Sequence, residues 1–420
     1  NFSADRSAIA SGGDSALPIG IPRACMFTFL SPLLAALAPA TLDVSRRSAL
    51  QGASLAAGAL AATTGAGAGA QALAVPRDSG ASAATVAAAP AAAAAAPPLV
   101  LPAMGIGAWA WGDSLFWKYD AKFDFELEEL FKYYASQPDA FLDTAELYGL
   151  GRSEMLIGDF ERRSGKRVKV ASKFAALPWK TRREDVVQAC EASLRRMGRS
   201  SMELYQIHFP NAWANEAYWD GLGDCYERGL VQAVGVSNYG ADAVEAVSTS
   251  LGRRGIPLYS NQIQYSLLYP FANSNGLKRK CDQLGVKVLA YSPIGLGLLS
   301  GKYSAEQLPE GPRAELAKAF FSGQPETAAG LVDAVAKTAE KHGATPSQVA
   351  INWCVAKGTT PIPGARNLRQ LKDNLGALSW RLDAADVARL DAASAAVQPL
   401  AKANPFPAKD VGSGLRMFDS

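Results

Sequence analysis

Four residues that could protonate a carbonyl oxygen follow short apolar stretches of this sequence. Asp143 and Tyr148 lie in AFLDTAELYG, Lys173 in VKVASKF and His208 in ELYQIHF. A phenol titrates near ~10 and needs a nearby cation to protonate an alkoxide efficiently at neutral pH. Lys173 can be that cation if Asp143 holds its charge, and His208 can donate to the carbonyl. The four residues together predict an acid for carbonyl reduction.

These groups meet if the apolar stretches are successive strands of one parallel barrel. In a βα barrel the carboxyl ends of the strands converge on one face, where barrel enzymes carry out their chemistry. Helical patterns alternate with the apolar runs, as in REDVVQACEASLRRMG. No GxGxxG fingerprint appears in the context that an open doubly wound sheet requires. The sequence therefore predicts a (β/α)8 TIM barrel whose parallel strands lie near residues 104–109, 140–145, 168–174, 203–209, 231–237, 258–265, 286–292 and 360–364.

Longer motifs in this region resemble those of the aldo-keto reductases. In the order of that family, the sequence contains FLDTAELYGLGRSE, ASKF, QIHF, GVSN, NQIQYS, AYSPIGLGLLSGKY and IPGARN, between about Met104 and about Val397. The resemblance implies a (β/α)8 barrel that binds a nicotinamide cofactor without a Rossmann fold. It also implies a catalytic tetrad made of Asp143, Tyr148, Lys173 and His208.

The nicotinamide is expected to lie against residues of the later strands. Ser237 and Asn238 close the fifth strand, where their side chains can hydrogen-bond a carboxamide, and Gln262 lies in the middle of the sixth. The resemblance makes Tyr291, at the end of the seventh strand, the ring that stacks on the nicotinamide; a tyrosine packed at the barrel rim is the alternative. Trp109, at the end of the first strand, is grouped with these cofactor-binding residues.

The phosphate and adenine ends are expected in two further segments. One is a loop whose backbone can approach a pyrophosphate, formed by Ser292, Gly295, Leu296 and Gly297. In the other, Gly364 is expected to turn the chain into a helix N-terminus, a natural anion site. Arg366 suits a 2′-phosphate and favours NADPH over NADH, although a solvated helix face is the alternative. Gln370 and Asn374 match family positions that hold the adenine.

The loops of such a barrel determine its substrate, and here they carry many aromatic residues. Those on or after strand ends are Trp109, Trp111, Phe116, Trp117, Trp179 and Trp213. They favour an aromatic or apolar aldehyde as the small-molecule substrate, or they pack the loops on one another. The resemblance is closest to plastid-type members and to the branch of the potassium-channel β subunits, which favours a pyridoxal-type or reactive aldehyde. The alternative function is a cofactor-binding, redox-sensing subunit with slow or no turnover.

Composition excludes several other classes of partner. The net charge is +3 over 420 residues, and basic residues form no long run, so neither a nucleic acid nor a membrane surface is expected to bind. The five cysteines form no CxxC pair and have no histidine at metal spacing. We therefore expect no metal site and no disulfide framework, and we interpret most of the cysteines as helix-packing thiols.

The first part of the chain differs in composition from the rest. The first hundred residues contain no Lys, Glu, Trp or Tyr and are rich in Ala, Gly, Ser and Pro. We expect residues 1–97 to be a disordered targeting leader that ends in the linker APAAAAAAPP, residues 98–397 to be the barrel, and residues 398–420 to be a C-terminal tail. Because the chain opens on Asn1, the stretch before Met26 is expected to be untranslated sequence or part of an incomplete fragment.

The leader contains two apolar cores, neither of which is suited to stable membrane insertion. Its richness in Ala and Ser, its arginines and its few acids resemble an organellar transit peptide, and two successive cores suggest a bipartite plastid signal. Arg46 and Arg47 before the second core, with AQA near residues 70–72, also resemble a twin-arginine signal. We expect a plastid location, with the stroma favoured and the thylakoid lumen as the alternative.

Overall fold

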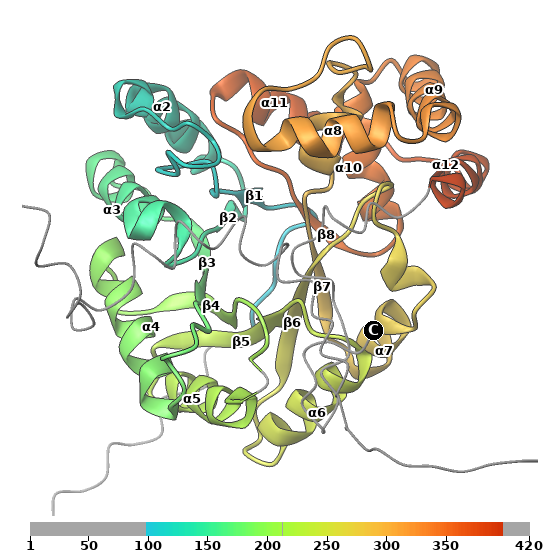
Figure 1. Cartoon of the computed structure of the whole chain (residues 1–420). Helices are drawn as coiled ribbons and strands as arrows, with labels where there is room; N and C mark the ends of the chain where they lie inside the picture. Colours follow the sequence, from blue (N-terminus) through green and yellow to red (C-terminus); the bar gives the residue numbers. More distant parts are fainter. Residues whose placement is uncertain (1–97, 212, 398–420) are drawn as a thin grey trace, which may run out of the picture. The chain divides into compact units, whose positions relative to one another are not determined.

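The computed structural model describes residues 98–211 and 213–397, and in them eight parallel strands pair in sequence order. Figure 1 shows these strands around the centre, with helices outside them. The strands are β1 (Ile106–Gly107), β2 (Phe141–Asp143), β3 (Lys169–Phe174), β4 (Met202–Ile207), β5 (Val231–Ser237), β6 (Leu258–Gln264), β7 (Lys287–Tyr291) and β8 (Thr360–Ile362). The predicted parallel barrel is confirmed.

A few backbone hydrogen bonds join the segments of the first and last strands and close the barrel. The N–H groups of Gly105 and Gly107 donate to the carbonyls of Pro361 and Pro363, each at 3.0 Å. A single parallel bridge joins Gly107 to Gly364. A Cβ on Gly105 would lie 2.4 Å from the Phe141 ring, so the close approach requires glycine there.

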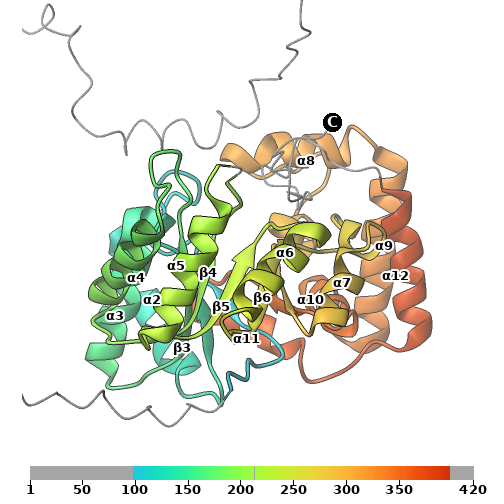
Figure 2. The same cartoon turned by 90° about the horizontal axis from the view of Figure 1, so that it is seen from below.

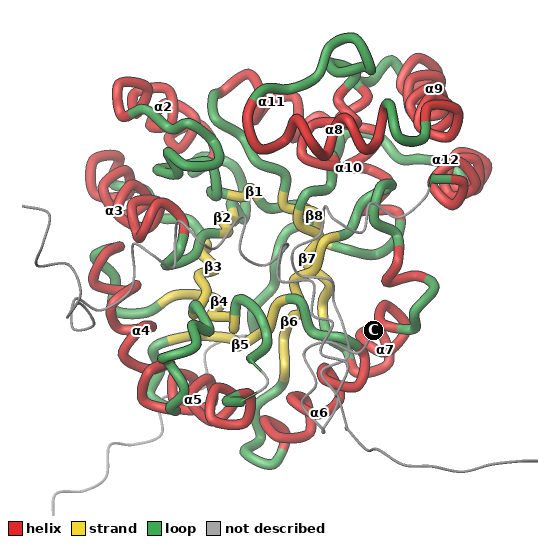
Figure 3. Tube along the Cα trace, in the orientation of Figure 1, coloured by secondary structure: helices red, strands yellow, loops and turns green. Residues whose placement is uncertain are grey.

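The strands are covered by amphipathic helices, which form the outer layer in Figure 3. In α4, Val186, Val187, Cys190 and Leu194 are all buried, as their spacing predicts. The helices are α2 (Asp124–Tyr134), α3 (Arg152–Ser164), α4 (Arg183–Met197), α5 (Asn215–Glu227), α6 (Ala241–Gly252), α7 (Leu277–Leu284), α8 (Ala314–Phe321), α9 (Pro325–His342), α10 (Pro346–Ala356), α11 (Leu368–Gly376) and α12 (Ala384–Ala396). Seen from the side in Figure 2, α8 lies toward one end of the barrel.

Short 3₁₀ helices occur in the connections between these elements. They are η1 (Ala121–Phe123), η2 (Tyr148–Gly151), η3 (Phe271–Asn273), η4 (Gly295–Ser300) and η5 (Gly311–Arg313). Two of them, η2 and η4, follow strand ends and carry residues of the expected site. The loops of the barrel therefore contribute locally ordered backbone to that site.

The inside of the barrel changes from apolar to polar along the strands. One buried cluster consists of inward side chains from six strands together with Leu99: Phe141, Ala171, Leu204, Ala233, Leu289 and Ile362. Two residues farther along their strands, on the same face, come Asp143, Lys173 and Gln206, all buried. The apolar layer thus supports a polar layer nearer the carboxyl ends of the strands.

The predictions for the leader and tail, including both signal readings, fall on residues 1–97 and 398–420, outside the described residues. Four cysteines lie on helices α4, α5, α7 and α10, and these are free and buried, as expected of packing thiols. Within residues 98–211 and 213–397, no helix is long and apolar enough to cross a bilayer. In the same ranges, no group of three or more His, Cys, Asp or Glu side chains is arranged to hold a metal ion.

Candidate active site

Lys173 is the centre of the polar layer, and it brings together three of the four predicted catalytic residues. Its ammonium group donates to Asp143 Oδ1 at 2.6 Å, to the Thr144 carbonyl at 2.8 Å and to the Tyr148 hydroxyl at 3.3 Å. The Lys173 side chain is 0% exposed and that of Asp143 is 2% exposed. A buried charge needs such partners, because losing its hydration is costly.

His208 completes the group from the end of β4. Its imidazole stands edge-on to the Tyr148 ring, with 5.7 Å between the ring centroids. Its Nδ1 is buried and has no hydrogen-bond partner among the described residues. Burial, followed by the nearby Lys173 charge, lowers the pKa of His208 well below its usual value, so the ring is neutral at neutral pH. A neutral imidazole carries one N–H with which to orient a carbonyl oxygen.

The expectation that Lys173 makes Tyr148 more acidic stays a prediction, because burial and two negative charges act on the phenol in the opposite direction. The pKa of Tyr148 is raised well above its usual value, first by burial and then by the negative charges of Asp143 and Asp113. Burial likewise raises the pKa of Asp143 and lowers that of Lys173, while their mutual attraction opposes both shifts. Tyr148 therefore holds its proton at neutral pH, which is the state that a proton donor requires.

Ser237, Asn238 and Tyr291 form one hydrogen-bonded group beside the tetrad. The Tyr291 hydroxyl donates to Asn238 Oδ1 at 2.9 Å, and Asn238 Nδ2 donates to the carbonyl of His208 at 3.1 Å. Ser237 Oγ donates to the carbonyl of Gln262 at 2.8 Å. Asn238 has φ = 63°, a left-handed conformation that asparagine tolerates better than most residues. The structure thus places these three predicted residues together at the strand ends.

Gln262 has a second contact that the sequence did not predict. Its Nε2 donates to Asp143 Oδ2 at 2.7 Å. Because Lys173 binds the other oxygen of the same carboxylate, Asp143 is held from both sides. Gln262 therefore supports the tetrad directly through Asp143, in addition to its predicted role beside the nicotinamide.

The predicted phosphate loop has the backbone conformation that its glycines suggested. Left-handed φ angles occur at all four of its predicted residues: Ser292, Gly295, Leu296 and Gly297. A Cβ on Gly295 would lie 2.4 Å from Leu268 Cδ1, so this position needs glycine for space as well as for conformation. The loop is therefore tightly wound against the barrel.

The segment after β8 differs in part from the prediction. Gly364 does not lead directly into a helix; it pairs with Gly107, and α11 begins after Asn367, whose side chain accepts the N–H of Gln370. Gln370 Oε1 in turn accepts the N–H of Arg366 at 2.9 Å. Asn374 Nδ2 donates to the Gly364 carbonyl at 3.2 Å. Gln370 and Asn374 thus hold this turn in place, a role that their spacing did not reveal.

Two guanidinium groups lie over the ring of Trp117. Arg366 is exposed, and its Cζ is 6.0 Å from the ring centroid. Arg313 of η5 lies 5.3 Å from the same ring and donates to the Leu296 carbonyl at 3.2 Å. Sequence reasoning missed Arg313, because it is 22 positions beyond Tyr291 in a segment without a motif. Arg313 ties the phosphate loop to the loop that follows β1.

The aromatic residues predicted at the mouth fall into two groups. Trp109 stacks on Phe116 with 4.7 Å between ring centroids, and it faces the Tyr148 ring at 6.2 Å and 29°. Trp117 stands edge-on to Trp109 at 5.5 Å. Trp111, by contrast, is fully buried and donates from Nε1 to the Ala365 carbonyl. For Trp111 the structure favours the packing alternative, since this ring packs against Phe160 of α3.

Trp179 and Trp213 lie on the loops after β3 and β4, and their side chains are 45% and 78% exposed. Neither takes part in the stack around Trp109 among the ring contacts of the described residues. Among the tryptophans that the structure describes, those of the β1 loop are therefore the ones that pack toward Tyr148.

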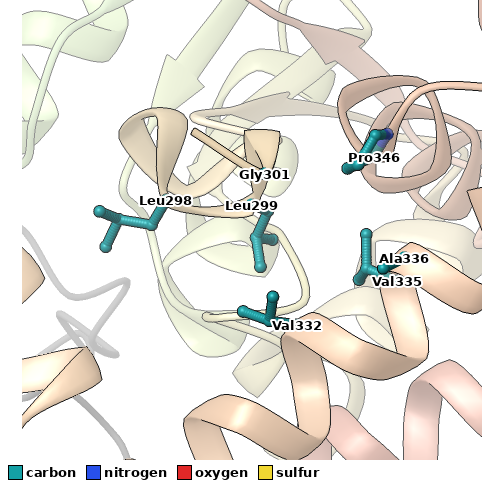
Figure 4. A pocket seen from close by; sticks show the side chains of 7 residues that line it. All are labelled: Leu298, Leu299, Gly301, Val332, Val335, Ala336 and Pro346. Carbon is teal, nitrogen blue, oxygen red and sulfur yellow. The ribbon is translucent and has the colours of Figure 1, made fainter. Parts of the chain in front are cut away.

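An apolar crevice lies where η4 packs near α9 and α10, and Figure 4 shows its lining. The lining residues are Leu298, Leu299, Gly301, Val332, Val335, Ala336 and Pro346. It contains none of the predicted catalytic or cofactor-binding residues. We interpret it as a packing seam that anchors the end of the phosphate loop.

Residues 103–395 match the model of the aldo/keto reductase family. The chain is 43% identical, over 303 residues, to the chloroplastic pyridoxal reductase of Arabidopsis thaliana, covering 68% of this chain and 81% of that protein. It also resembles a thermostable aldo-keto reductase solved with the inhibitor epalrestat (TM-score 0.57, 27% identity, 70% of this chain and 95% of that one). An aldo-keto reductase from Klebsiella pneumoniae solved with NADPH shares the fold (TM-score 0.55, 23% identity, 70% and 90%). The chain belongs to the aldo/keto reductase family.

Proposed function

We propose that this protein reduces the carbonyl group of aldehydes, with NADPH as the reductant and Tyr148 as the proton donor. Carbonyl reduction in general follows from the family. The assignment of Tyr148 as the proton donor rests on the 3.3 Å contact between the Lys173 ammonium and the Tyr148 hydroxyl, in a buried setting. Such a contact can stabilise the phenolate that remains once the proton has moved.

Each member of the tetrad then has a distinct task. Tyr148 keeps its proton until negative charge develops on the carbonyl oxygen, and then donates it. Lys173 offsets the charge left on the phenolate, and Asp143 keeps Lys173 charged despite burial. The neutral His208 donates an N–H that orients the oxygen of the substrate.

The residues around the tetrad fit a phosphorylated dinucleotide. Arg366 is exposed and forms no salt bridge with any other described residue, so its guanidinium is available for a 2′-phosphate. The left-handed backbone at Ser292 and Leu296 leaves the loop after β7 able to present its amides to a pyrophosphate. When bound, NADPH supplies the hydride. In this proposal Asn238 and Ser237 orient its carboxamide.

For the substrate we propose a pyridoxal-type aromatic aldehyde. The stack of Trp109 and Phe116 beside Tyr148 offers a flat apolar wall for a ring. The Arabidopsis relative named a pyridoxal reductase supports the same class. Steady-state NADPH oxidation against a panel of aldehydes that includes pyridoxal tests the proposal. Tight NADPH binding without turnover of any aldehyde would favour the redox-sensing alternative.

We also propose a plastid location, with the stroma favoured over the thylakoid lumen. The support is the composition of the leader and the chloroplastic relative. A fluorescent reporter fused to the segment from Met26 to about Val75 should enter plastids, and diffuse cytosolic fluorescence would contradict this. Replacing Arg46 and Arg47 by lysine should have no effect unless the twin-arginine route is used.

A further inference from the structure

The β1 loop carries a carboxylate that the proposed reaction does not use. Asp113 Oδ1 accepts the N–H groups of Leu115 and Phe116, each at 2.9 Å. Its main-chain carbonyl accepts the N–H of Tyr119 at 3.0 Å. These bonds fix the residue, which is half-buried. In the part of the chain that the structure describes, its second oxygen accepts no hydrogen bond and no cation pairs with it.

This carboxylate lies beside the aromatic wall and the proton donor. Phe116, whose N–H binds Asp113, stacks on Trp109, and Trp109 in turn faces the ring of Tyr148. The negative charge of Asp113 also contributes to the raised pKa of Tyr148. A ring held against Trp109 with its aldehyde at Tyr148 would therefore have Asp113 at its edge.

None of the neighbouring cations within residues 98–211 and 213–397 forms an ion pair with Asp113. Lys173 pairs with Asp143. Arg152, which packs against Gly112, pairs with Asp124 at 3.2 Å and also contacts the Tyr119 hydroxyl. The exposed Lys118 pairs with Glu310 at 3.3 Å. Arg313 and Arg366 lie over Trp117.

A free carboxylate next to electron-rich ring faces is the arrangement that recognises an organic cation. The rings attract a positive charge through their faces, and the carboxylate adds a directed ionic contact. A neutral or anionic ring would leave Asp113 without a partner when the mouth is covered, which costs binding free energy.

We propose that Asp113 is a specificity-determining residue that selects aromatic aldehydes carrying a positive charge on or beside the ring, such as a protonated pyridine. The inference rests on the proposed carbonyl reduction and narrows its substrate class. The ring lies against Trp109 and Phe116, and its charge faces Asp113.

Two probes of nearly the same shape test this in the full chain. One is para-trimethylammonio-benzaldehyde and the other is para-tert-butyl-benzaldehyde, so they differ by one charge. Asp113→Asn keeps an oxygen that can accept the two backbone N–H groups, and therefore removes the charge without releasing the loop. Asp120→Asn is the matched control, because Asp120 also caps a loop amide, that of Lys122, in the same segment.

The measured quantity is the ratio of kcat/KM for the cationic probe to kcat/KM for the neutral one. Asp113→Asn should lower this ratio roughly two- to fivefold, as expected for a partly exposed ion pair, and Asp120→Asn should leave it unchanged. An unchanged ratio in Asp113→Asn, or an equal loss for both probes, would overturn the assignment while leaving the reductase intact. If the unsubstituted protein oxidises NADPH with neither probe nor any other aldehyde, the proposed function itself fails, and this inference with it.

Discussion

The tetrad and the β1 loop both border the barrel mouth, but their polar groups are satisfied in different ways. In the tetrad, both oxygens of Asp143 are hydrogen-bonded and Lys173 is completely buried. In the β1 loop, Asp113 uses one oxygen for backbone amides, and its other oxygen accepts no hydrogen bond from residues 98–211 or 213–397. The tetrad is thus a hydrogen-bonded network without spare acceptors on Asp143, which suits fixed chemistry. The β1 loop retains an acceptor on Asp113 that a ligand can bind.

The two regions also differ in how they are supported. Asp143 and Lys173 stand on neighbouring strands over an apolar layer, and strand register fixes the distance between them. Trp109 and Phe116 are held by ring stacking within one loop. The loops are nevertheless joined, since a Cβ on Gly149, next to Tyr148, would lie 2.3 Å from the Gly112 carbonyl oxygen. Changes in the strands should therefore affect kcat, and changes in the rim should affect KM.

The largest effect is expected from Tyr148→Phe. Because Tyr148 is the proposed proton donor, kcat should fall roughly 10²- to 10⁴-fold. NADPH affinity, measured by fluorescence titration, should stay nearly the same. Full retention of activity would remove Tyr148 from the mechanism and leave the tetrad without its acid.

Lys173→Met should lower kcat by about 10²-fold, because the phenolate loses its stabilising charge. The change also leaves the Asp143 carboxylate buried without its ion pair, so the thermal midpoint should fall as well. Lys180→Met is a matched control, since Lys180 pairs at 2.9 Å with Glu146 in a more exposed position. Comparable losses of kcat in both variants would argue that lysine removal damages the barrel as a whole.

Arg366→Ala should weaken NADPH binding roughly tenfold to a hundredfold, the amount expected for a charge-assisted hydrogen bond to the 2′-phosphate. NADH binding should change little, because NADH lacks that group. Arg369→Ala provides the control, because Arg369 is also an exposed arginine and is the second residue of α11. Equal losses for NADPH and NADH would mean that Arg366 acts through its packing on Trp117.

Phe116→Ala tests the rim directly. Loss of the stack on Trp109 should raise KM for aromatic aldehydes roughly two- to tenfold. The kcat should change little, because the hydrogen bonds that hold Lys173 run to Asp143, Thr144 and Tyr148. A large fall in kcat with unchanged KM would place the β1 loop in the chemistry and abolish the distinction between the two regions.

Features that depend on local spacing could be predicted from the sequence. The positions of Asp143, Lys173 and His208 at strand ends follow from apolar runs, and the structure confirms those strands. Contacts between distant segments could not be predicted in this way. Examples are the Gln262–Asp143 hydrogen bond, the Arg313–Leu296 contact and the burial of Trp111 behind α3. Each depends on side-chain packing in three dimensions, which periodicity does not encode.

The pKa of Tyr148 shows this limit most clearly, and it gives the smallest expected effect. The sequence indicated a cation beside the phenol, but it did not indicate that burial and the charges of Asp143 and Asp113 raise the pKa of Tyr148. A raised pKa keeps Tyr148 protonated as the pH increases, and the lowered pKa of His208 keeps the imidazole neutral as the pH decreases toward its usual value of about 6.5. The kcat for aldehyde reduction should therefore be nearly constant between about pH 7 and about pH 9. A steady decline of kcat from neutral pH upward would contradict this prediction. It would mean that, with substrate bound, the positive charge of Lys173 lowers the pKa of Tyr148 more than the two carboxylates raise it.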